Sequence, residues 1–297
     1  MYDIIVIGGS FAGQAAALQI ARARRQVLVI DTKKPRNRFA SASHGFLGHD
    51  GLPPAAIMLK AREQLLAYPT ARFTESEVIS AVATRDGFSI ALANGEQHQA
   101  KRLILATGVA DILPDIPGLK ERWGETVLHC PYCHGYEFGG RQLGVIATSP
   151  MALHQAMLIP DWGPTTFFTN DSIQLDAEKT NELKNRGVVI EDCPVQSLVG
   201  EGEQLDGVLL TDGRFIEIAA VFIGPQNRMT NPLAEQLGCA FEDGPLGPAL
   251  KVDEFQKTTV PGVFAAGDSS SFKHNATFAA ASGVMAGVAA HRSLFML

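Results

Sequence analysis

The 297-residue sequence is poor in cysteine, in charged side chains and in long apolar runs. It holds only four cysteines, too few for a disulfide scaffold of this size. We therefore expect an intracellular protein in which any cysteine pair takes part in a reaction and does not merely stabilise the fold. Charged residues make up 19% of the chain and hydrophobic residues 46%, a balance that argues against extended disorder. The 25 Lys and Arg residues are outnumbered by 31 Asp and Glu residues, and the net charge of −6 argues against DNA or RNA as a partner.

Membrane and export signals are also missing. No apolar run approaches the roughly 18 residues that cross a bilayer. No basic segment or cleavage site stands before the first apolar run, Ile4–Ile7. We therefore expect a cytoplasmic protein with no membrane partner. At roughly 100–200 residues per domain, the length predicts two domains.

Strands alternate with helices along the chain, in a pattern that occurs twice. The first unit starts at the strand Ile4–Ile7 and the second at Leu143–Ala147. Each unit also holds a β-hairpin, marked by Asn94-Gly95 in one and by Asp212-Gly213 in the other. Residues 35–54, rich in Gly and Pro, are expected to be irregular chain. The repeat predicts an α/β fold with two Rossmann-like nucleotide-binding domains of three-layer ββα type.

A glycine-rich turn, Gly8-Gly9-Ser10-Phe11-Ala12-Gly13, lies between the first strand and the helix that follows it. With Asp31 at the end of the next strand, these residues form the fingerprint of a dinucleotide site. Gly8 makes the tight turn, Gly13 lets helix and strand pack closely, and the helix N-terminus faces the pyrophosphate. Asp31 is expected to accept hydrogen bonds from the ribose hydroxyls. Ser10 replaces the middle glycine, and a purely structural glycine-rich turn is the alternative.

Four motifs, in this order, resemble those of the small thioredoxin reductase family. They are the fingerprint with Asp31, Ala106-Thr107-Gly108, Cys130-Pro131-Tyr132-Cys133 and Val263-Phe264-Ala265-Ala266-Gly267-Asp268. The resemblance covers nearly the whole chain. It implies an FAD-dependent oxidoreductase that holds FAD in its first nucleotide domain and forms a homodimer.

The resemblance also implies how the FAD site is built. Ala106-Thr107-Gly108 is expected to line the dinucleotide cleft, and Asp268, next to Gly267, to hydrogen-bond the ribityl chain of the flavin. The segment that starts at Asn275 is similar to the family's flavin-facing helix start. There the backbone N–H of Ala276 meets the flavin, and the helix dipole favours negative charge on the reduced ring. Taken alone, Asp268 is more typical of a helix N-cap.

The order of the motifs interleaves the two domains along the chain. The FAD domain is expected to take residues 1–112 and 243–297. An NAD(P)-binding-like domain, residues 113–242, is expected to be inserted in the FAD domain and to carry Cys130 and Cys133. The Pro-rich stretch Leu113–Gly118 is the expected crossover between the domains, and Gly244–Pro248 is the expected return.

Cys130 and Cys133 have the spacing that lets two sulfurs close a small ring across one turn. No second C-x-x-C or histidine pair stands nearby, which argues against structural zinc and predicts no metal site. A C-x-x-C at a helix start lowers the pKa of one sulfur toward or below neutral. By resemblance to the family, Cys133 contacts the flavin C4a, and Cys130 attacks the partner disulfide or is attacked by the substrate thiol. Cys193 and Cys239 stand alone and are expected to be small buried residues.

His134 follows the pair directly, where thioredoxin reductases usually carry an Asp that donates and accepts the proton. A histidine with a pKa of about 6.5 suits that task at neutral pH. The segment Cys130–Glu137 resembles the motif of the family's dithiol oxidase branch. Those enzymes close disulfides in small-molecule natural products and pass the electrons to oxygen. The alternative is a structural or surface histidine, with Glu137 a solvated side chain.

The second domain lacks the fingerprint of the first. After Leu143–Ala147 the chain reads Thr148-Ser149-Pro150-Met151, where neither of the first two glycine positions is kept and Pro150 removes a backbone N–H. The next strand ends in Thr169-Asn170-Asp171, an acid with no Arg to pair the 2′-phosphate of NADPH. Charge-assisted bonds contribute about 1.5–3 kcal/mol each. NAD(P)H, the cofactor that the fold implies, is therefore expected to bind weakly.

The sequence thus favours a thioredoxin reductase-like enzyme that exchanges electrons between FAD and a dithiol or disulfide through Cys130 and Cys133. The expected partner is a small dithiol or disulfide, or a thioredoxin-like protein. Whether NAD(P)H or oxygen is the outer partner stays open, and an oxygen-dependent dithiol oxidase of a small molecule is one alternative. The other is a flavin-binding redox sensor, in which the disulfide switches a partner surface without turnover.

Overall fold

The computed structural model describes residues 1–296, which divide into two compact units. The first unit comprises Met1–Arg38, Ala55–Ala110 and the chain from Asn227 onward, and the second comprises Phe39–Pro54 and Asp111–Gln226. Within the described residues, none of the helices is both long enough and apolar enough to traverse a lipid bilayer. Each unit has its own sheet and its own core, and each is described by itself.

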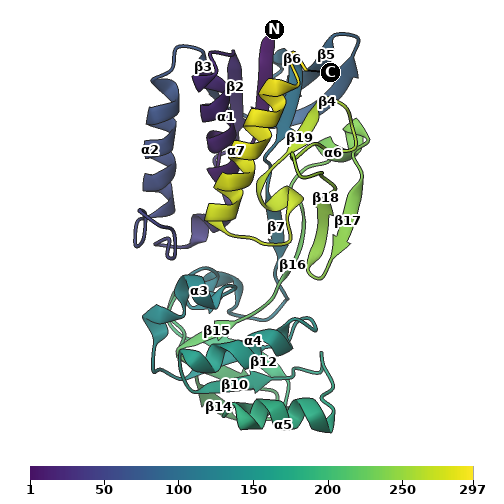
Figure 1. Cartoon of the computed structure of the whole chain (residues 1–297). Coiled ribbons are helices and arrows are strands. Elements are labelled where there is room, and N and C mark those ends of the chain that lie inside the picture. The colour runs from purple at the N-terminus through teal and green to yellow at the C-terminus, as the bar shows by residue number, and fades with distance from the viewer. Residues whose placement is uncertain (297) are drawn as a thin grey trace. The chain divides into compact units, whose positions relative to one another are not determined.

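The sheet of the first unit (Figure 1) has the strand order β3-β2-β1-β6-β5-β4, with β19 also paired to β6. Its strands are β1 (Tyr2–Ile7), β2 (Val27–Asp31), β3 (Ala71–Glu75), β4 (Val78–Thr84), β5 (Gly87–Leu92), β6 (Gln97–Leu105) and β19 (Val263–Ala265). β1, β2, β3, β6 and β19 run parallel, whereas β5 pairs antiparallel with β4 and β6. The hairpin predicted at Asn94-Gly95 is confirmed as the turn between β5 and β6.

Side chains of β1 alternate between two buried layers. Ile4 and Val6 join the core that this unit's sheet shares with α1, α2 and α7. Ile5 and Ile7 join the core on the other face, with side chains of β4, β5 and α6. A parallel strand that is buried on both faces is apolar at every position, which explains the unbroken run in the sequence. The helices of this unit are α1 (Phe11–Arg22), α2 (Pro54–Leu66), α6 (Leu233–Leu237) and α7 (Ala276–Arg292).

Helices α1 and α7 lie side by side (Figure 1) because α7 presents glycines to α1. A Cβ on Gly283 would lie 2.1 Å from the carbonyl oxygen of Ala12, and one on Gly287 would lie 2.6 Å from that of Ala16. Neither position leaves room for a side chain. The last helix is thereby held against the helix that follows the glycine-rich turn, so both ends of the chain belong to one unit.

The second unit has a parallel sheet in the order β11-β10-β9-β15-β8 and an antiparallel sheet in the order β12-β13-β14. Its strands are β8 (Val127–Leu128), β9 (Leu143–Ile146), β10 (Thr165–Phe168), β11 (Val189–Glu191), β12 (Val195–Val199), β13 (Gly207–Leu210), β14 (Phe215–Glu217) and β15 (Ala220–Phe222). Its helices are α3 (Pro131–His134), α4 (Ala152–Leu158) and α5 (Ala177–Asn185). The order β11-β10-β9-β15 corresponds to β3-β2-β1-β6, so the predicted α/β fold with two Rossmann-like domains is confirmed.

Two further strand pairs complete the described chain. β7 (Val109–Ile112) pairs with β16 (Gln226–Met229), and β17 (Phe241–Gly244) pairs with β18 (Gly247–Leu250). The expected return between domains at Gly244–Pro248 is wrong, because these residues belong to the β17–β18 hairpin of the first unit. The chain re-enters the first unit earlier, after Gln226.

The two units differ from the expected division into residues 1–112 with 243–297 and residues 113–242. Residues 111–112 belong to the second unit, and two longer segments also change place. Residues 227–242 belong to the first unit, because Leu233, Ala234 and Cys239 are buried in its core.

Residues 39–54 belong to the second unit. The backbone N–H of Ser41 donates to the Glu125 carboxylate at 2.9 Å, and a Cβ on Gly124 would lie only 2.6 Å from that of Phe39. Contacts with distant side chains, rather than position in the sequence, therefore decide where this segment lies.

Candidate active site

The glycine-rich turn is built so tightly that at two of its positions a Cβ would collide with backbone atoms. Gly8 has a φ of +104°, and a Cβ there would lie 2.1 Å from the Ala106 carbonyl oxygen. A Cβ on Gly13 would lie 1.8 Å from the carbonyl oxygen of Gly8. The turn therefore passes between the end of β6 and the start of α1 without side chains at these two positions. A dinucleotide pyrophosphate can approach such a backbone closely.

Asp31 lies beside this turn at the end of β2. Its carboxylate accepts hydrogen bonds from the backbone N–H of Gly9 at 2.8 Å and of Lys33 at 3.0 Å. Ser10 is the N-cap residue of α1, but its side chain makes no capping bond and its hydroxyl contacts the Met58 sulfur at 3.8 Å. The carboxylate is thus oriented by the backbone of the turn itself.

The remaining residues expected at the FAD site also belong to the first unit. Thr107 follows β6, and its carbonyl accepts a bond from the Thr230 hydroxyl at 3.2 Å, while Gly108 has a φ of +65°. The strands β1, β2, β6 and β19 are mutually parallel, so the residues after each of them meet at one edge of the sheet.

Asp268 is held by an arginine that the motifs do not contain. Its carboxylate lies 2.9 Å from Arg36 Nη1, and both side chains are about four-fifths buried. Asp268 therefore does not act as a helix N-cap; that role falls to Asn275, whose side chain accepts the Thr277 N–H at 2.8 Å. Ala276 is the first residue of α7.

Cys130 and Cys133 lie together at the start of α3, as their spacing predicts. Cys130 is the N-cap residue, Pro131 begins the helix, and the two sulfurs are 2.7 Å apart as free thiols. Both side chains are partly buried. The sulfurs are near enough to form or break a bond with little movement of either side chain.

The two thiols differ strongly in pKa. Hydrogen bonding from the Cys133 thiol, with help from the backbone N–H groups of Cys133 and Tyr132, lowers the pKa of Cys130 to about 7 against the opposing effect of burial. The same bond, together with burial and the negative charge of Glu137, raises the pKa of Cys133. The reduced pair therefore holds its negative charge on Cys130, the sulfur at the helix start.

Alkylation of the reduced protein by iodoacetamide should report this difference. Because the thiolate is the reactive form, labelling of Cys130 is expected to be slow in acid, to rise with pH and to reach half its maximal rate near pH 7, its pKa being about 7. Cys133, with a raised pKa, should label last. Peptide mass spectrometry after labelling at a series of pH values measures both. A Cys133 that labels before Cys130 would contradict the assignment.

His134 stands directly after the pair and is neutral at neutral pH. Burial lowers its pKa, and the nearby His44 ring lowers it further, while Glu137 acts in the opposite direction. A neutral imidazole beside a thiol can accept its proton. The Glu137 side chain is 39% exposed, and its carboxylate lies 3.4 Å from His44 Nε2. His44 was missed in the sequence, where nothing links it to the cysteine motif.

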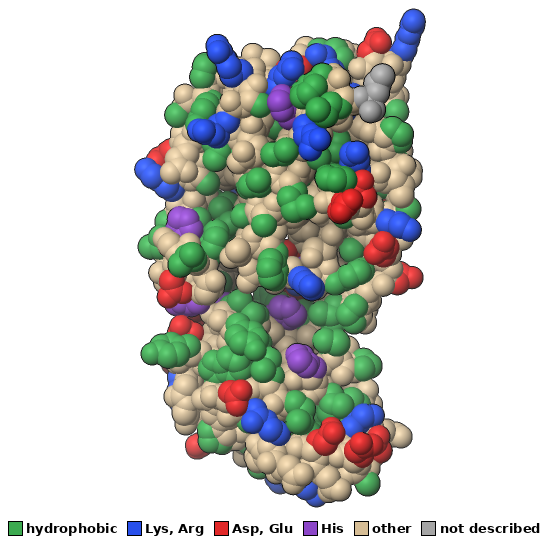
Figure 2. Space-filling view, viewed as in Figure 1, with side chains coloured by type: hydrophobic (Ala, Val, Ile, Leu, Met, Phe, Trp, Pro, Cys, Tyr) green, Lys and Arg blue, Asp and Glu red, His purple; other side chains and the backbone are tan. Residues whose placement is uncertain are grey.

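Aromatic side chains stand open to solvent around the pair. Tyr132 is 71% exposed and Tyr136 is 86% exposed. The Tyr132 ring meets Trp162 edge-on at 5.4 Å. On the face drawn in Figure 2, hydrophobic side chains gather over the part of the second unit where α3 lies. The two cysteines thus have exposed tyrosines next to them in the chain.

The other two cysteines lie apart from the pair. Cys239 is buried, and burial raises the pKa of its thiol. Cys193 is partly buried, 3.4 Å from the Thr211 hydroxyl.

The loop after β9 does not form a phosphate cradle like that of the first unit. The Thr148 hydroxyl donates to the Gly224 carbonyl at 3.1 Å, and Pro150 has no N–H to offer. The helix that follows, α4, has only 7 residues. A nucleotide pyrophosphate would therefore find few backbone donors at this turn.

The ends of β10 and β11 carry acids rather than free bases. Arg214 lies here, but its guanidinium is bonded to Glu191 at 2.6 Å and to Asp212 at 2.7 Å. Asp171 and Asp192 add further negative charge. These residues do not fit the 2′-phosphate of NADPH, which needs unpaired cationic donors.

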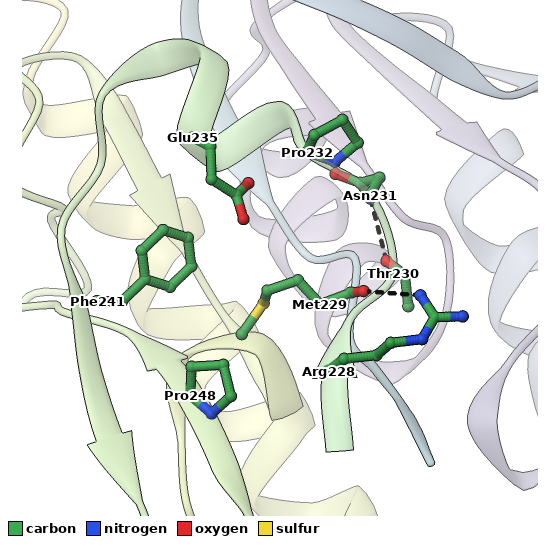
Figure 3. Close-up of a pocket in the computed structure, with 8 residues that line it drawn as sticks. All are labelled: Arg228, Met229, Thr230, Asn231, Pro232, Glu235, Phe241 and Pro248. Carbon is green, nitrogen blue, oxygen red and sulfur yellow. Dashed lines mark hydrogen bonds between the residues drawn. The ribbon is translucent and has the colours of Figure 1, made fainter. Parts of the chain in front are cut away.

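A surface hollow of about 630 Å³ lies in the first unit (Figure 3). It is lined by Arg228, Met229, Thr230, Asn231, Pro232, Glu235, Phe241 and Pro248. None of these residues was predicted for the cofactor or thiol site. We therefore do not assign the redox chemistry to this hollow.

The chain belongs to the pyridine nucleotide-disulphide oxidoreductase family, whose profile matches residues 2–292. A thioredoxin reductase of Claviceps purpurea, tcpT, is 33% identical over 303 residues, which cover 98% of this chain and 94% of that protein. The crystal structure of an oxidoreductase from Agrobacterium tumefaciens is 47% identical, with a TM-score of 0.95 over 99% of this chain and 98% of that one. The crystal structure of HlmI is 36% identical, with a TM-score of 0.91 over 99% of this chain and 92% of that one. The expected resemblance to low-molecular-weight thioredoxin reductases is confirmed, and the chain is an oxidoreductase enzyme of that class.

Proposed function

We propose that this enzyme exchanges electrons between bound FAD and a dithiol or disulfide through Cys130 and Cys133. The observation that carries the proposal is the pair itself: two sulfurs 2.7 Å apart at a helix start, with the pKa of Cys130 lowered to about 7. A thiolate at neutral pH is the nucleophile of thiol–disulfide exchange. A small dithiol or a thioredoxin-like protein as partner, a homodimer and a cytoplasmic location are carried over from the family and belong to the proposal.

FAD fits the first unit. The bare backbone at Gly8 and Gly13 allows the approach of a pyrophosphate, and Asp31 is oriented for the ribose hydroxyls. Asp268, fixed by Arg36, would hold the ribityl chain, with Ala276 at the start of α7 beside the flavin. FAD, when bound, supplies the two-electron redox chemistry. The protein's own part is to hold the cofactor and to present the sulfurs and the proton carriers.

Within the thiol pair, each residue has a separate task. Cys130 attacks a partner disulfide, because its sulfur is the better stabilised thiolate. In the opposite direction the substrate thiol attacks Cys130, and the Cys133 sulfur is the leaving group. Cys133, with its raised pKa, accepts a proton when the bond between the sulfurs breaks. His134, neutral through burial, takes the proton of the incoming thiol.

An oxygen-dependent dithiol oxidase of a small molecule is the second candidate. It is favoured by the acidic edge of the second unit, where Arg214 is already bonded to Glu191 and Asp212. An enzyme that draws its electrons from the dithiol needs no reduced nicotinamide. The exposed Tyr132 and Tyr136 beside the pair also suit a small apolar substrate.

Anaerobic mixing of the FAD-loaded protein with a single reductant tests the electron route. A small dithiol is expected to bleach the flavin absorbance quickly, and NADPH or NADH at the same concentration at least about 100-fold more slowly, because several charge-assisted phosphate contacts are missing. Admission of air should then restore the colour through repeated cycles if the oxidase candidate holds.

Three other results would redirect the proposal. Rapid bleaching by NADPH would overturn the argument from the second unit and leave a nicotinamide-driven reductase. Bleaching by dithiol without reoxidation in air would exclude the oxidase. A single reduction with no further turnover, whatever donor or acceptor is supplied, would favour a redox sensor.

A further inference from the structure

His44 connects the thiol pair with solvent through two carboxylates. Its Nε2 lies 3.4 Å from a carboxylate oxygen of Glu137, and its Nδ1 lies 3.8 Å from one of Asp50. Its ring meets that of His134 edge-on, with 6.2 Å between the ring centroids. The Asp50 side chain is 72% exposed, whereas that of His44 is 24% exposed. The Glu137 side chain is 39% exposed, so both carboxylates are more open to solvent than the histidine that lies between them.

The thiol chemistry leaves a proton that must reach solvent. When a dithiol reduces the enzyme, two S–H bonds of the dithiol and the Cys130–Cys133 bond break, and one S–S bond forms in the product. Two electrons pass to the enzyme sulfurs and two protons are released. Cys133, whose pKa is raised, takes one proton, but Cys130, whose pKa is about 7, does not keep the other above neutral pH. That proton passes first to His134.

We propose that His44 is a positioning residue and proton carrier for the thiol pair, which receives this proton from the side of His134 and passes it to Glu137 and Asp50, the two carboxylates that reach solvent. The inference rests on the proposed function of Cys130 and Cys133 as the site of thiol–disulfide exchange. An imidazole between two carboxylates suits this role, because it can bind a proton on one nitrogen while it releases one from the other.

The loop that carries His44 is fixed in this position. The Asp50 carboxylate accepts the backbone N–H of Gly45 at 2.8 Å, which holds it beside the histidine that precedes this glycine. The groups with titratable or charged side chains that face His44 are Asp50 of its own loop, and Glu137 and His134 of the segment after the cysteines.

A kinetic comparison of two variants separates proton transfer from a structural role. Glutamine at position 44 keeps a side-chain N–H for Glu137 but cannot carry a proton. Dithiothreitol reduces the Cys130–Cys133 disulfide, and we expect His44→Gln to lower the rate of this reaction about tenfold at about pH 6.5 in dilute buffer. The rates of His44→Gln and of the wild type should become equal at about pH 9, where the thiol of dithiothreitol loses its proton without help from the protein. In His44→Ala, added imidazole should restore the rate at the lower pH.

The rate is measured by acid quenching of the FAD-loaded protein, alkylation and mass counting of free thiols. His154→Gln is the matched control, because His154 is exposed on α4, and its rate should equal the wild type. A wild-type rate in His44→Gln at the lower pH would overturn the inference. So would a loss that is equal at every pH and that imidazole does not restore.

Since this measurement counts sulfurs and not flavin colour, its outcome is separate from that of the proposed function. If the flavin never bleaches while the His44 effect persists, only the proposed electron transfer to FAD is refuted. If the flavin bleaches normally and His44→Gln has no effect, only the proposed role of His44 is refuted.

Discussion

A Cys130→Ser variant is expected to lose dithiol-driven flavin reduction by roughly 1,000-fold or more, with its FAD content unchanged. The serine hydroxyl does not ionise near neutral pH and cannot form a disulfide with the substrate, whereas the pKa of Cys130 is about 7. The residues expected to bind FAD, among them Gly8, Gly13 and Asp31, are untouched by the change. Stopped-flow absorbance under anaerobic conditions, after the flavin content has been measured, gives both quantities.

The partner variant and a control complete the experiment. Cys133→Ser should leave the nucleophile in place but remove its resolving sulfur. When this variant is mixed with the disulfide form of the substrate, the Cys130 thiolate should attack one substrate sulfur and release the other as a thiol, so a mixed disulfide should accumulate and be visible by intact mass. Cys193→Ser should react like the wild type, because Cys193 lies against Thr211 and takes no part in the pair. Turnover that survives in Cys130→Ser would refute the role given to this sulfur.

A Gly13→Ala variant is expected to be purified with little FAD and to be destabilised by about 3 kcal/mol. The added methyl group would lie 1.8 Å from the carbonyl oxygen of Gly8, where backbone and not a movable side chain stands in the way. To make room, the turn or the start of α1 must shift, and the path of bare backbone beside the pyrophosphate is lost. The ratio of flavin to protein absorbance measures the first effect, and urea unfolding the second.

Gly95→Ala is the matched control for this substitution. Gly95 has a φ of +89° in the β5–β6 hairpin, and a Cβ there would meet no atom within 4 Å. Only backbone strain of about 1 kcal/mol is expected, with full FAD content. If Gly13→Ala kept its flavin as well as this control does, the turn would not be the cradle that its packing indicates.

Features that depend on a few neighbouring residues could be predicted from the sequence. The hairpins at Asn94-Gly95 and Asp212-Gly213 need a glycine with positive φ, and Gly95 and Gly213 have values of +89° and +87°. The close packing of Gly13 on the Gly8 carbonyl and the sulfur contact of Cys130 with Cys133 likewise follow from short spacing along the chain. In each of these, the interacting groups are local, so their order in the chain is enough to place them.

Features that depend on distant contacts could not be predicted in this way. Arg36 and His44 both lie in the stretch that we expected to be irregular chain, yet each side chain reaches a carboxylate far along the sequence, at Asp268 and Glu137. A Gly- and Pro-rich segment has no periodic pattern that would show which side chain turns inward. The partners of such a loop are decided by tertiary packing alone, and the same is true of the pairing of β7 with β16.

The placement of residues 39–54 with the second unit has a consequence for protein engineering. A fragment made from residues 111–226 alone would contain both working sulfurs, His134 and Glu137, but neither His44 nor Asp50. The thiols of this fragment would lack the proposed proton carrier. A graft of this redox centre onto another scaffold must therefore carry two separate pieces of chain, because its smallest portable form is not continuous in sequence.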